Sequence, residues 1–544
     1  TVLSAASWGS LLGDAFDLDN NNVLQTALAA IQNHPVYATL GVLGVLAVTK
    51  AIKRARVFNM IDGPETKSLL WGDEALLFEF SSSLDIHEKL LNTYGSVCRL
   101  KGTFGEDRLW IADPRAMSEI FLKSYDDFRE PPIMIAWTTL TMGPHLVTTH
   151  GHRHKVHRKI LKPVFTASHM RNLTPLFNSI GERLEDIVAA EAQANGGKTG
   201  VVDMSKWMSN LALEMIGQGG MGHSFGAMDR SEKSPDYIVA AGRLFPLISE
   251  MWYLRPILSQ LMKIGPPRFR RLIVDHAPVG SVEAMKRVVD TLDRTANEIY
   301  ARKKDALEKG TLESEIAAGS DIMSMLLKQN QIVPKEDQLS EEEIVATVSA
   351  LVFAGHDTTS GALARTLELL AQHPDIQTQL RKELQEAHML YGKDLDYDQL
   401  NSLTFLDAVC RESLRLHSPA TFVERIAQKD YDMPLHYPIK SKDGKTTISS
   451  IHVPKGTHLY LSLCSTNRDK QTWGEDVDQF KPSRWLQPLP PSVVDAKIPG
   501  LYSSTMTFLG GPRGCLGFKF SQLEMKVVLS RLVSSFLFEH SGHD

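Results

Sequence analysis

Cysteine is scarce in this chain, because its 544 residues contain only Cys98, Cys410, Cys464 and Cys515. These four lie far apart and form no CxxC pair, which argues against a disulfide framework or a zinc site and favours a reducing compartment. An excess of basic charge is also absent, since 59 Lys and Arg accompany 64 Asp and Glu and the net charge is -5. Binding to nucleic acid is therefore not expected.

Repeats and long Ser-, Gly- or Pro-rich linkers are missing too, so no feature of the sequence enforces several domains. The composition, with 43% hydrophobic and 23% charged residues, is typical of a soluble globular body.

One apolar segment, 36–49, carries no charge and is followed by Lys50, Lys53, Arg54 and Arg56. In a cleaved signal peptide the basic residues would precede the apolar stretch.

This segment predicts a single membrane anchor. About 14 helical residues cover about 21 Å, less than the hydrocarbon core of about 30 Å, so the span is extended to about residue 52. Lys and Arg stay on the cytoplasmic side, which predicts an N-terminal segment, 1–57, with the anchor at about 36–52, and a cytosol-facing catalytic domain, 58–544. A helix lying in the membrane interface is the closest alternative.

The predicted elements are mainly helical with a small β region. A hairpin is expected at 97–100 and 109–111, a helix from Pro114 to Leu122, and short extended segments between 434 and 463. The longest predicted helix begins after Ser340, which forms a capping box with Glu343, and continues to Pro374. At about 33 residues it would be about 50 Å long and would cross the whole molecule.

The chemistry is concentrated near the C-terminus, in a loop that reads FLGGPRGCLG from Phe508 to Gly517. Its glycines allow backbone N–H groups to approach the sulfur of Cys515, Arg513 adds positive charge, and a helix follows; all three favour thiolate over thiol. A nucleophile would need an adjacent histidine, which the sequence cannot place. A lone thiolate in such a loop is what an axial ligand of haem iron requires.

The loop resembles the haem loop of the cytochrome P450 monooxygenases, F-x-x-G-x-R-x-C-x-G. All five fixed positions are filled, by Phe508, Gly511, Arg513, Cys515 and Gly517. The resemblance implies the cytochrome P450 fold, with haem b held between the long central helix and the Cys loop. It also implies that Cys515 is the metal ligand and that the other four residues bind the cofactor.

A second motif of that family lies inside the long helix, at Ala354-Gly355-His356-Asp357-Thr358-Thr359. Gly and Thr lower helix propensity, and a Thr hydroxyl can bond to the carbonyl four residues earlier and bend the axis. The resemblance implies that Asp357 and Thr358, assisted by Thr359, relay protons for oxygen activation. His356 is interpreted as a packing residue without a catalytic role.

The remaining motifs are expected to support the Cys loop and to neutralise the charge of the haem propionates. Glu412 and Arg415 lie on one helical face, and the resemblance implies a buried network of Glu412, Arg415 and Arg484 behind the Cys loop. Haem propionates need cations; beside Arg513, the candidates are Arg425 and Arg158, with His154 at the position where the family usually has Trp. The basic stretch around His154, residues 151–159, also offers charges for docking of an acidic redox protein, namely Arg153, Lys155 and Lys159.

The resemblance implies a haem-thiolate monooxygenase that inserts one oxygen atom of O2 into a lipophilic substrate. The implied electron donor is an NADPH-dependent diflavin reductase, cytochrome P450 reductase, with a small electron-transfer haem protein as a second candidate; no flavin motif is visible, so NADPH is used only indirectly. The implied location is the endoplasmic reticulum membrane. The alternatives are a haem-thiolate isomerase or dehydratase and a non-catalytic haem sensor or carrier.

Several further parts of the chain are predicted to serve the substrate. Residues 131–145, Phe353 and residues 419–423 are expected to line the pocket. Residues 244–264 are apolar but contain Pro246 and Pro256, so they cannot form one continuous helix. This stretch is interpreted as a lid dipping toward the bilayer, with an ordinary core segment as the alternative.

Overall fold

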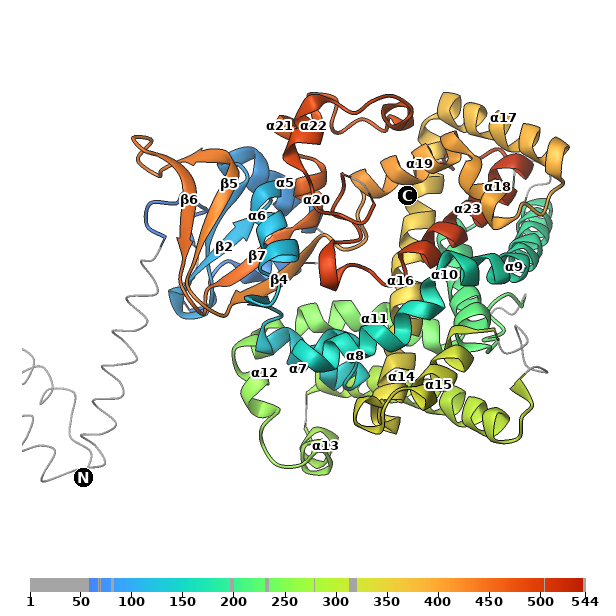
Figure 1. The fold of residues 1–544 in the computed structure, drawn as a ribbon, viewed down its shortest axis with the longest axis horizontal. Coiled ribbons are helices and arrows are strands. Elements are labelled where there is room, and N and C mark those ends of the chain that lie inside the picture. Colours follow the sequence, from blue (N-terminus) through green and yellow to red (C-terminus); the bar gives the residue numbers. More distant parts are fainter. Residues whose placement is uncertain are drawn as a thin grey trace, which may run out of the picture.

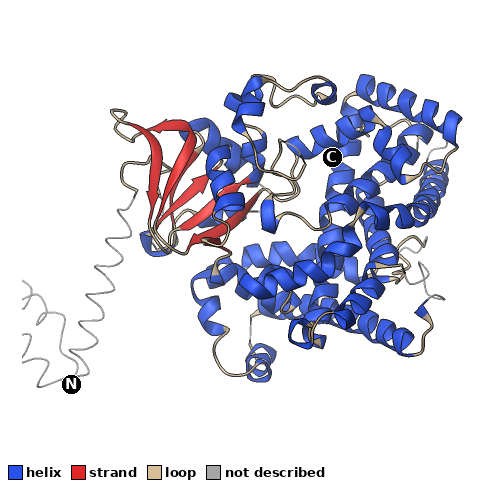
Figure 2. Ribbon diagram, in the orientation of Figure 1, coloured by secondary structure: helices blue, strands red, loops and turns tan. Residues whose placement is uncertain are grey.

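The computed structural model describes residues 58–541 except 67, 69, 80–82, 196–199, 230–233, 278, 313–319 and 503. Helices make up most of the described chain, and the strands gather at one side (Figure 2). The predicted fold class, mainly α with a small β region, is confirmed. The expected anchor at about 36–52, within the segment 1–57, lies outside the described residues, and no helix in the described part is long and apolar enough to span a bilayer.

The β region consists of a mixed five-stranded sheet and a separate hairpin. The predicted hairpin is present as β1 (Val97–Lys101) and β2 (Asp107–Ile111), which pair antiparallel with Val97 opposite Ile111. The sheet order is β1-β2-β7-β4-β3. The other strands are β3 (Phe128–Arg129), β4 (Phe422–Ala427), β5 (Tyr431–Lys440), β6 (Thr447–Val453) and β7 (His458–Ser462), with β5 and β6 forming the hairpin.

Helix α16 (Glu341–Gln372) crosses the middle of the molecule (Figure 1). Its capping box is formed as predicted, because the Glu343 N–H donates to Ser340 Oγ at 3.2 Å and the Ser340 N–H donates to Glu343 Oε2 at 2.9 Å. Pro374 opens the next helix, so α16 ends within two residues of the predicted stop. Local capping chemistry therefore sets both ends of the element that organises the site.

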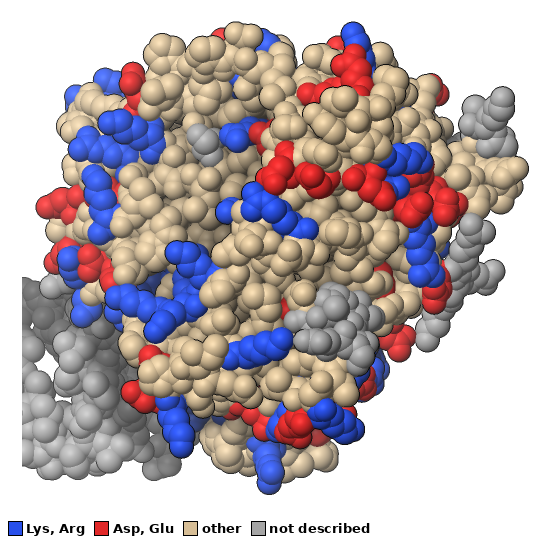
Figure 3. Space-filling view, turned by 45° about the vertical axis from the view of Figure 1, so that its right-hand side comes forward, with Lys and Arg blue, Asp and Glu red and all other residues tan. Residues whose placement is uncertain are grey.

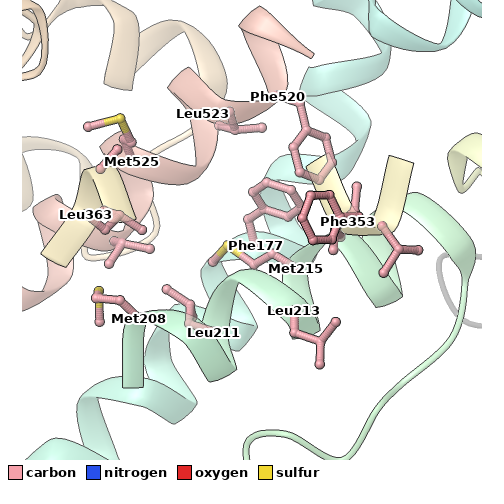
Figure 4. Close-up of a cluster of buried hydrophobic side chains, with 14 of the residues drawn as sticks. Phe177, Met208, Leu211, Leu213, Met215, Phe353, Leu363, Phe520, Leu523 and Met525 are labelled. Carbon is pink, nitrogen blue, oxygen red and sulfur yellow. The ribbon is translucent and has the colours of Figure 1, made fainter. Parts of the chain in front are cut away.

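The largest core cluster surrounds α16. Helices α9 (Ala167–Ala194), α10 (Met204–Met215), α14 (Gly280–Glu308) and α23 (Phe518–Ser535) supply most of its neighbours. Figure 4 shows Phe177, Met208, Phe353 and Leu523 among the side chains that meet there. Because α23 begins directly after the Cys loop and packs on α9 and α16, this core also holds the loop in place.

The proline-containing stretch 244–264 is not one continuous helix, as predicted, and the break lies just before Pro256 rather than at Pro246. Pro246 lies inside α11 (Asp236–Glu250), and the chain instead breaks at a short 3-10 turn, Trp252–Leu254. Pro256 occupies the first turn of α12 (Arg255–Leu261), where an N–H needs no helical partner. The expected helix from Pro114 is α6 (Pro114–Ser118), continued by a wider π-helical turn, Glu119–Lys123.

The remaining helices complete the body around these elements. They are α4 (Glu74–Phe78), α5 (Ser83–Tyr94), α7 (Pro132–Met142), α8 (Gly151–Leu161), α13 (Pro267–Asp275), α15 (Ile322–Ile332), α17 (Pro374–Tyr391), α18 (Tyr397–Ser402), α19 (Thr404–Leu416), α20 (Leu463–Asn467), α21 (Lys470–Trp473) and α22 (Pro491–Ala496).

Candidate functional site

The Cys loop has a backbone that requires its glycines. Gly511 has a φ of +63°, and a Cβ there would lie 2.2 Å from the Phe121 carbonyl oxygen. A Cβ on Gly510 would lie 1.7 Å from the Pro499 carbonyl oxygen. The Cys515 N–H donates to the Phe508 carbonyl at 2.8 Å and closes the loop. Contacts with the chain on both sides therefore set the direction in which the cysteine points.

Cys515 is exposed, whereas Cys98, Cys410 and Cys464 are buried. The protein around it raises the pKa of the Cys515 thiol, although the backbone N–H groups of Gly517 and Phe518 and the Arg158 guanidinium oppose that shift. The loop N–H groups and a nearby cation thus favour the thiolate, as expected, and the surrounding protein opposes them. The nearby cation is Arg158 rather than Arg513. A metal ion bonded to the sulfur would favour the thiolate further, because a coordinating thiol is deprotonated.

A bare stripe runs along the middle of α16. Ala354, Thr358 and Gly361 are exposed although neighbouring residues on the same helix, such as Phe353 and Thr359, are buried. The spacing i, i+4 and i+7 places the three on one face. A Cβ added at Gly361 or at Gly517 would meet no atom within 4 Å. Open space beside a helix that crosses the interior, and beside the exposed sulfur, fits a large flat cofactor.

A carboxylate joins two of the predicted propionate cations. Glu130 Oε1 lies 3.2 Å from Arg425 Nη2, and Glu130 Oε2 lies 3.3 Å from Arg513 Nη2. Arg513 Nη2 also donates to the Thr149 carbonyl at 2.9 Å. Sequence reasoning missed Glu130, because a single acid just before α7 belongs to no motif and its partners lie almost 300 residues away or more.

The third cation reaches the loop from α8. Arg158 Nη1 donates to the Gly514 carbonyl at 2.8 Å, and His154, one turn earlier, is buried. Burial, together with the nearby Arg513 and Arg158, lowers the pKa of His154 to about 3, so its imidazole is neutral at pH 7. The side chains of His154, Arg158 and Arg513 line a hollow of about 430 Å³.

The charges in this region match the two propionates of haem b. Arg158, Arg425 and Arg513 carry three positive charges, and Glu130 is the one carboxylate that pairs with them in the described part of the chain. The excess of two positive charges would otherwise be partly buried without compensation, which is costly. The loop, the stripe and the cations therefore fit haem b.

The acid and alcohol pair lies where α16 meets the open space. Thr358 Oγ1 donates to the Ala354 carbonyl at 2.7 Å, so the hydroxyl is on the bare stripe. Asp357 is half-buried, burial raises the pKa of its carboxyl, and no hydrogen bond to its carboxylate occurs within the described residues. Thr359 is buried. The structure thus brings Thr358 to the predicted place and leaves Thr359 behind it.

The three-residue network behind the loop is formed. Arg415 donates through Nε and Nη2 to the two Glu412 oxygens, each at 2.9 Å, and Arg484 Nε donates to Glu412 Oε1 at 3.3 Å. Trp485 Nε1, which sequence reasoning missed, donates to Glu412 Oε2 at 2.9 Å. Arg415 Nη1 also donates to the carbonyl of Asn467 at 3.0 Å, which connects the network to the segment before the loop.

The fold and this site define a haem-thiolate protein. The chain belongs to the cytochrome P450 family, whose sequence profile matches residues 74–544.

Curated relatives agree with this assignment. The chain is 43% identical to cytochrome P450 monooxygenase 212 of Postia placenta over 84% of this chain and 83% of that protein. It is 39% identical to cytochrome P450 monooxygenase 91 of the same fungus over 92% and 93%. It is 40% identical to ganoderic acid synthetase of Ganoderma lucidum over 82% of each. The predicted family, haem cofactor and haem-thiolate monooxygenase class are confirmed.

Proposed function

We propose that this monooxygenase receives its electrons from a separate NADPH-dependent diflavin reductase and oxidises a lipophilic substrate at the endoplasmic reticulum membrane. The reaction is RH + O2 + 2 electrons + 2 protons giving ROH + H2O. The observation that carries the proposal is that Cys515 of the Cys loop and the α16 face with Thr358 are both exposed, although α16 crosses the interior. When bound, haem supplies the activation of dioxygen.

The residues of the loop and of α8 hold the cofactor in this proposal. Cys515 ligates the iron as thiolate, and Phe508, Gly511 and Gly517 shape the loop that presents it. Arg158, Arg425 and Arg513 neutralise the propionates, since their excess charge is uncompensated within the described protein. His154, neutral at pH 7, offers a ring N–H on the same side.

Asp357 and Thr358 deliver protons in this proposal. Thr358 lies on the open face, and its hydroxyl can turn from the Ala354 carbonyl toward the reacting oxygen. The raised pKa of Asp357 makes its carboxyl a better proton donor near neutral pH than an exposed aspartate. Thr359, buried behind them, contributes only to their support.

The relay predicts the behaviour of two variants. Thr358→Ala and Asp357→Asn are expected to lower product formation about 100-fold, while NADPH consumption continues and its electrons appear as hydrogen peroxide. The measurement is product and peroxide per NADPH with added diflavin reductase. Thr347→Ala is the matched control, because Thr347 makes the same bond to the carbonyl four residues earlier but is buried. Unchanged product per NADPH in both variants would remove Asp357 and Thr358 from the relay, whereas product formed without NADPH would favour an isomerase.

The surface near the hollow suits an acidic redox protein. Arg129, Lys155, Lys159 and Lys162 are exposed around it, and Asp126 is the one acidic residue in its lining. Figure 3 shows one face of the molecule, on which basic side chains (blue) and acidic side chains (red) are interspersed. Contrary to the expectation, Arg153 does not belong to this surface, because its Nε donates to Glu343 Oε1 at 2.7 Å. Its charge is paired with this carboxylate in the first turn of α16.

Charge reversal tests the docking surface. Lys155→Glu combined with Lys159→Glu is expected to raise the reductase concentration for half-maximal turnover several-fold, most strongly at low salt, with an unchanged haem spectrum. Lys382→Glu on α17 is the control. A saturation curve identical to that of the parent at low salt would remove this surface from the proposal.

An apolar surface on α12 and α13 supports contact with a membrane. Ile257, Leu261, Phe269, Leu272 and Ile273 are 38–56% exposed. They accompany three arginines on α13, as in helices that lie in a bilayer interface. These helices lie at the lower edge in Figure 1. The surface proposed to face the membrane therefore overlaps only the second half of the predicted lid, 244–264, and continues to Ile273.

Vesicle flotation tests the membrane proposal. Residues 58–544, without the predicted anchor, are expected to float with phosphatidylcholine and phosphatidylserine vesicles. Phe269→Ser combined with Leu272→Ser should reduce the floating fraction several-fold without changing the haem spectrum. Ile332→Ser, at an exposed apolar residue on α15, is the control. If residues 58–544 stay at the bottom of the gradient, the surface is not a membrane contact.

A further inference from the structure

A buried polar cluster lies on the side of α16 next to the relay. Tyr237, at the start of α11, and His356 are each 3% exposed, and their ring centroids are 6.2 Å apart in an edge-on arrangement. His356 Nε2 is 2.8 Å from Ser209 Oγ on α10. The Tyr237 hydroxyl and His356 Nδ1 have no hydrogen-bond partner within the described residues. Buried polar atoms are seldom left unpaired, so each calls for an explanation.

Asp357 follows His356 directly in α16, so it is next in sequence to the residue whose ring meets that of Tyr237. Burial, together with the Asp357 carboxylate, raises the pKa of the Tyr237 phenol, which therefore stays protonated at neutral pH. A protonated phenol is a hydrogen-bond donor. Asp357, for its part, is a half-buried acceptor without a hydrogen-bond donor in the described chain. A donor without a partner on α11 thus faces a helix that carries an acceptor without a partner, within the described residues.

We propose that Tyr237 is a positioning residue for Asp357. Its hydroxyl donates a hydrogen bond to the carboxylate, directly or through one water, when the carboxylate turns toward the core. This bond sets the position from which Asp357 serves Thr358. The inference rests on the proposed proton relay and extends it to a residue on a different helix, so that packing of α11 against α16 affects proton delivery.

His356 competes for the role of acceptor. Burial lowers the pKa of His356 to about 4, so the ring is neutral and its Nδ1 accepts when Nε2 donates to Ser209. A bond from Tyr237 to His356 Nδ1 would be a purely structural contact. The two arrangements differ in one respect: only the first acts through Asp357.

Tyr237→Phe tests the inference, because it removes the hydroxyl and keeps the ring that packs against Phe225, with centroids 5.4 Å apart. The full-length enzyme is supplied with NADPH and purified diflavin reductase without added substrate. The readouts are hydrogen peroxide per NADPH and the solvent isotope effect on NADPH oxidation. We expect the peroxide fraction and the isotope effect to change by at least about twofold, with an unchanged reduced carbon monoxide spectrum.

A double-mutant cycle gives the decision. In an Asp357→Asn background, Tyr237→Phe should have no further effect on peroxide per NADPH, because a residue that acts through Asp357 has nothing left to position. The inference is overturned if Tyr237→Phe behaves as the parent, if its effect persists in that background, or if Ser209→Ala reproduces it. If Asp357→Asn itself changes nothing, the proposed relay fails and the inference fails with it.

Discussion

Replacing Cys515 by Ser is expected to abolish the thiolate band of the reduced carbon monoxide complex and to reduce monooxygenase turnover to background. The protein around residue 515 already raises the pKa of a thiol, and a hydroxyl ionises far less readily, so the serine oxygen would remain neutral. A neutral oxygen cannot supply the electron density that a thiolate gives to the iron. Difference spectra and haem content per polypeptide measure the effect.

Cys464→Ala is the matched control for this substitution. Cys464 is buried and its Sγ lies 3.5 Å from Ser462 Oγ, so its loss alters packing in the sheet region without touching the loop. The control should keep the thiolate band and most of its turnover. A Cys515→Ser protein with an intact thiolate band would mean that another sulfur binds the iron.

Replacing Glu412 by Ala is expected to lower the free energy of unfolding by about 3–5 kcal/mol and to prevent stable haem incorporation. Arg415 is fully buried, and without Glu412 its charge would lose its carboxylate partner. The damage should reach the loop: Arg415 Nη1 binds the Asn467 carbonyl, and Asn467 Oδ1 accepts from the Met506 N–H at 2.6 Å, just before the loop. Urea unfolding and haem content measure both effects.

Asp398→Ala serves as the comparison for this variant. Asp398 pairs with Arg171, but both side chains are at least half exposed, so solvent screens the pair and it contributes little to stability. It should retain full haem content. Purification of Glu412→Ala with a normal thiolate band and parental stability would refute the role assigned to the buried network.

Features that depend on neighbours along the chain could be predicted from the sequence. The capping box of Ser340 and Glu343, the hairpin of β1 and β2 and the glycines of the Cys loop are encoded within a few residues each. Pro246 is the exception, because α11 tolerates it and the chain breaks at residues 252–254 instead. Packing of α11 on α14 outweighs the lost N–H there.

Features that depend on partners distant in sequence could not be predicted. Glu130 joins Arg425 to Arg513 across almost 300 residues or more, and Arg153 turns to Glu343 instead of to the surface. Tyr237 is an ordinary residue in its own helix, and its proposed role arises only because α11 places it beside His356, the residue before Asp357. No periodicity or spacing in the sequence carries this information.

The sequence by itself determined which groups are available: one cysteine in a glycine-rich loop, an acid and an alcohol within a long helix, and an acid spaced three residues from an arginine. Tertiary structure decided their ionisation and their distant partners. Burial raises the pKa of the Asp357 carboxyl and lowers that of the His154 imidazole to about 3, because the packed protein removes water that would solvate the charged forms. Desolvation and long-range pairing arise from packing, and packing is a property of the folded chain as a whole.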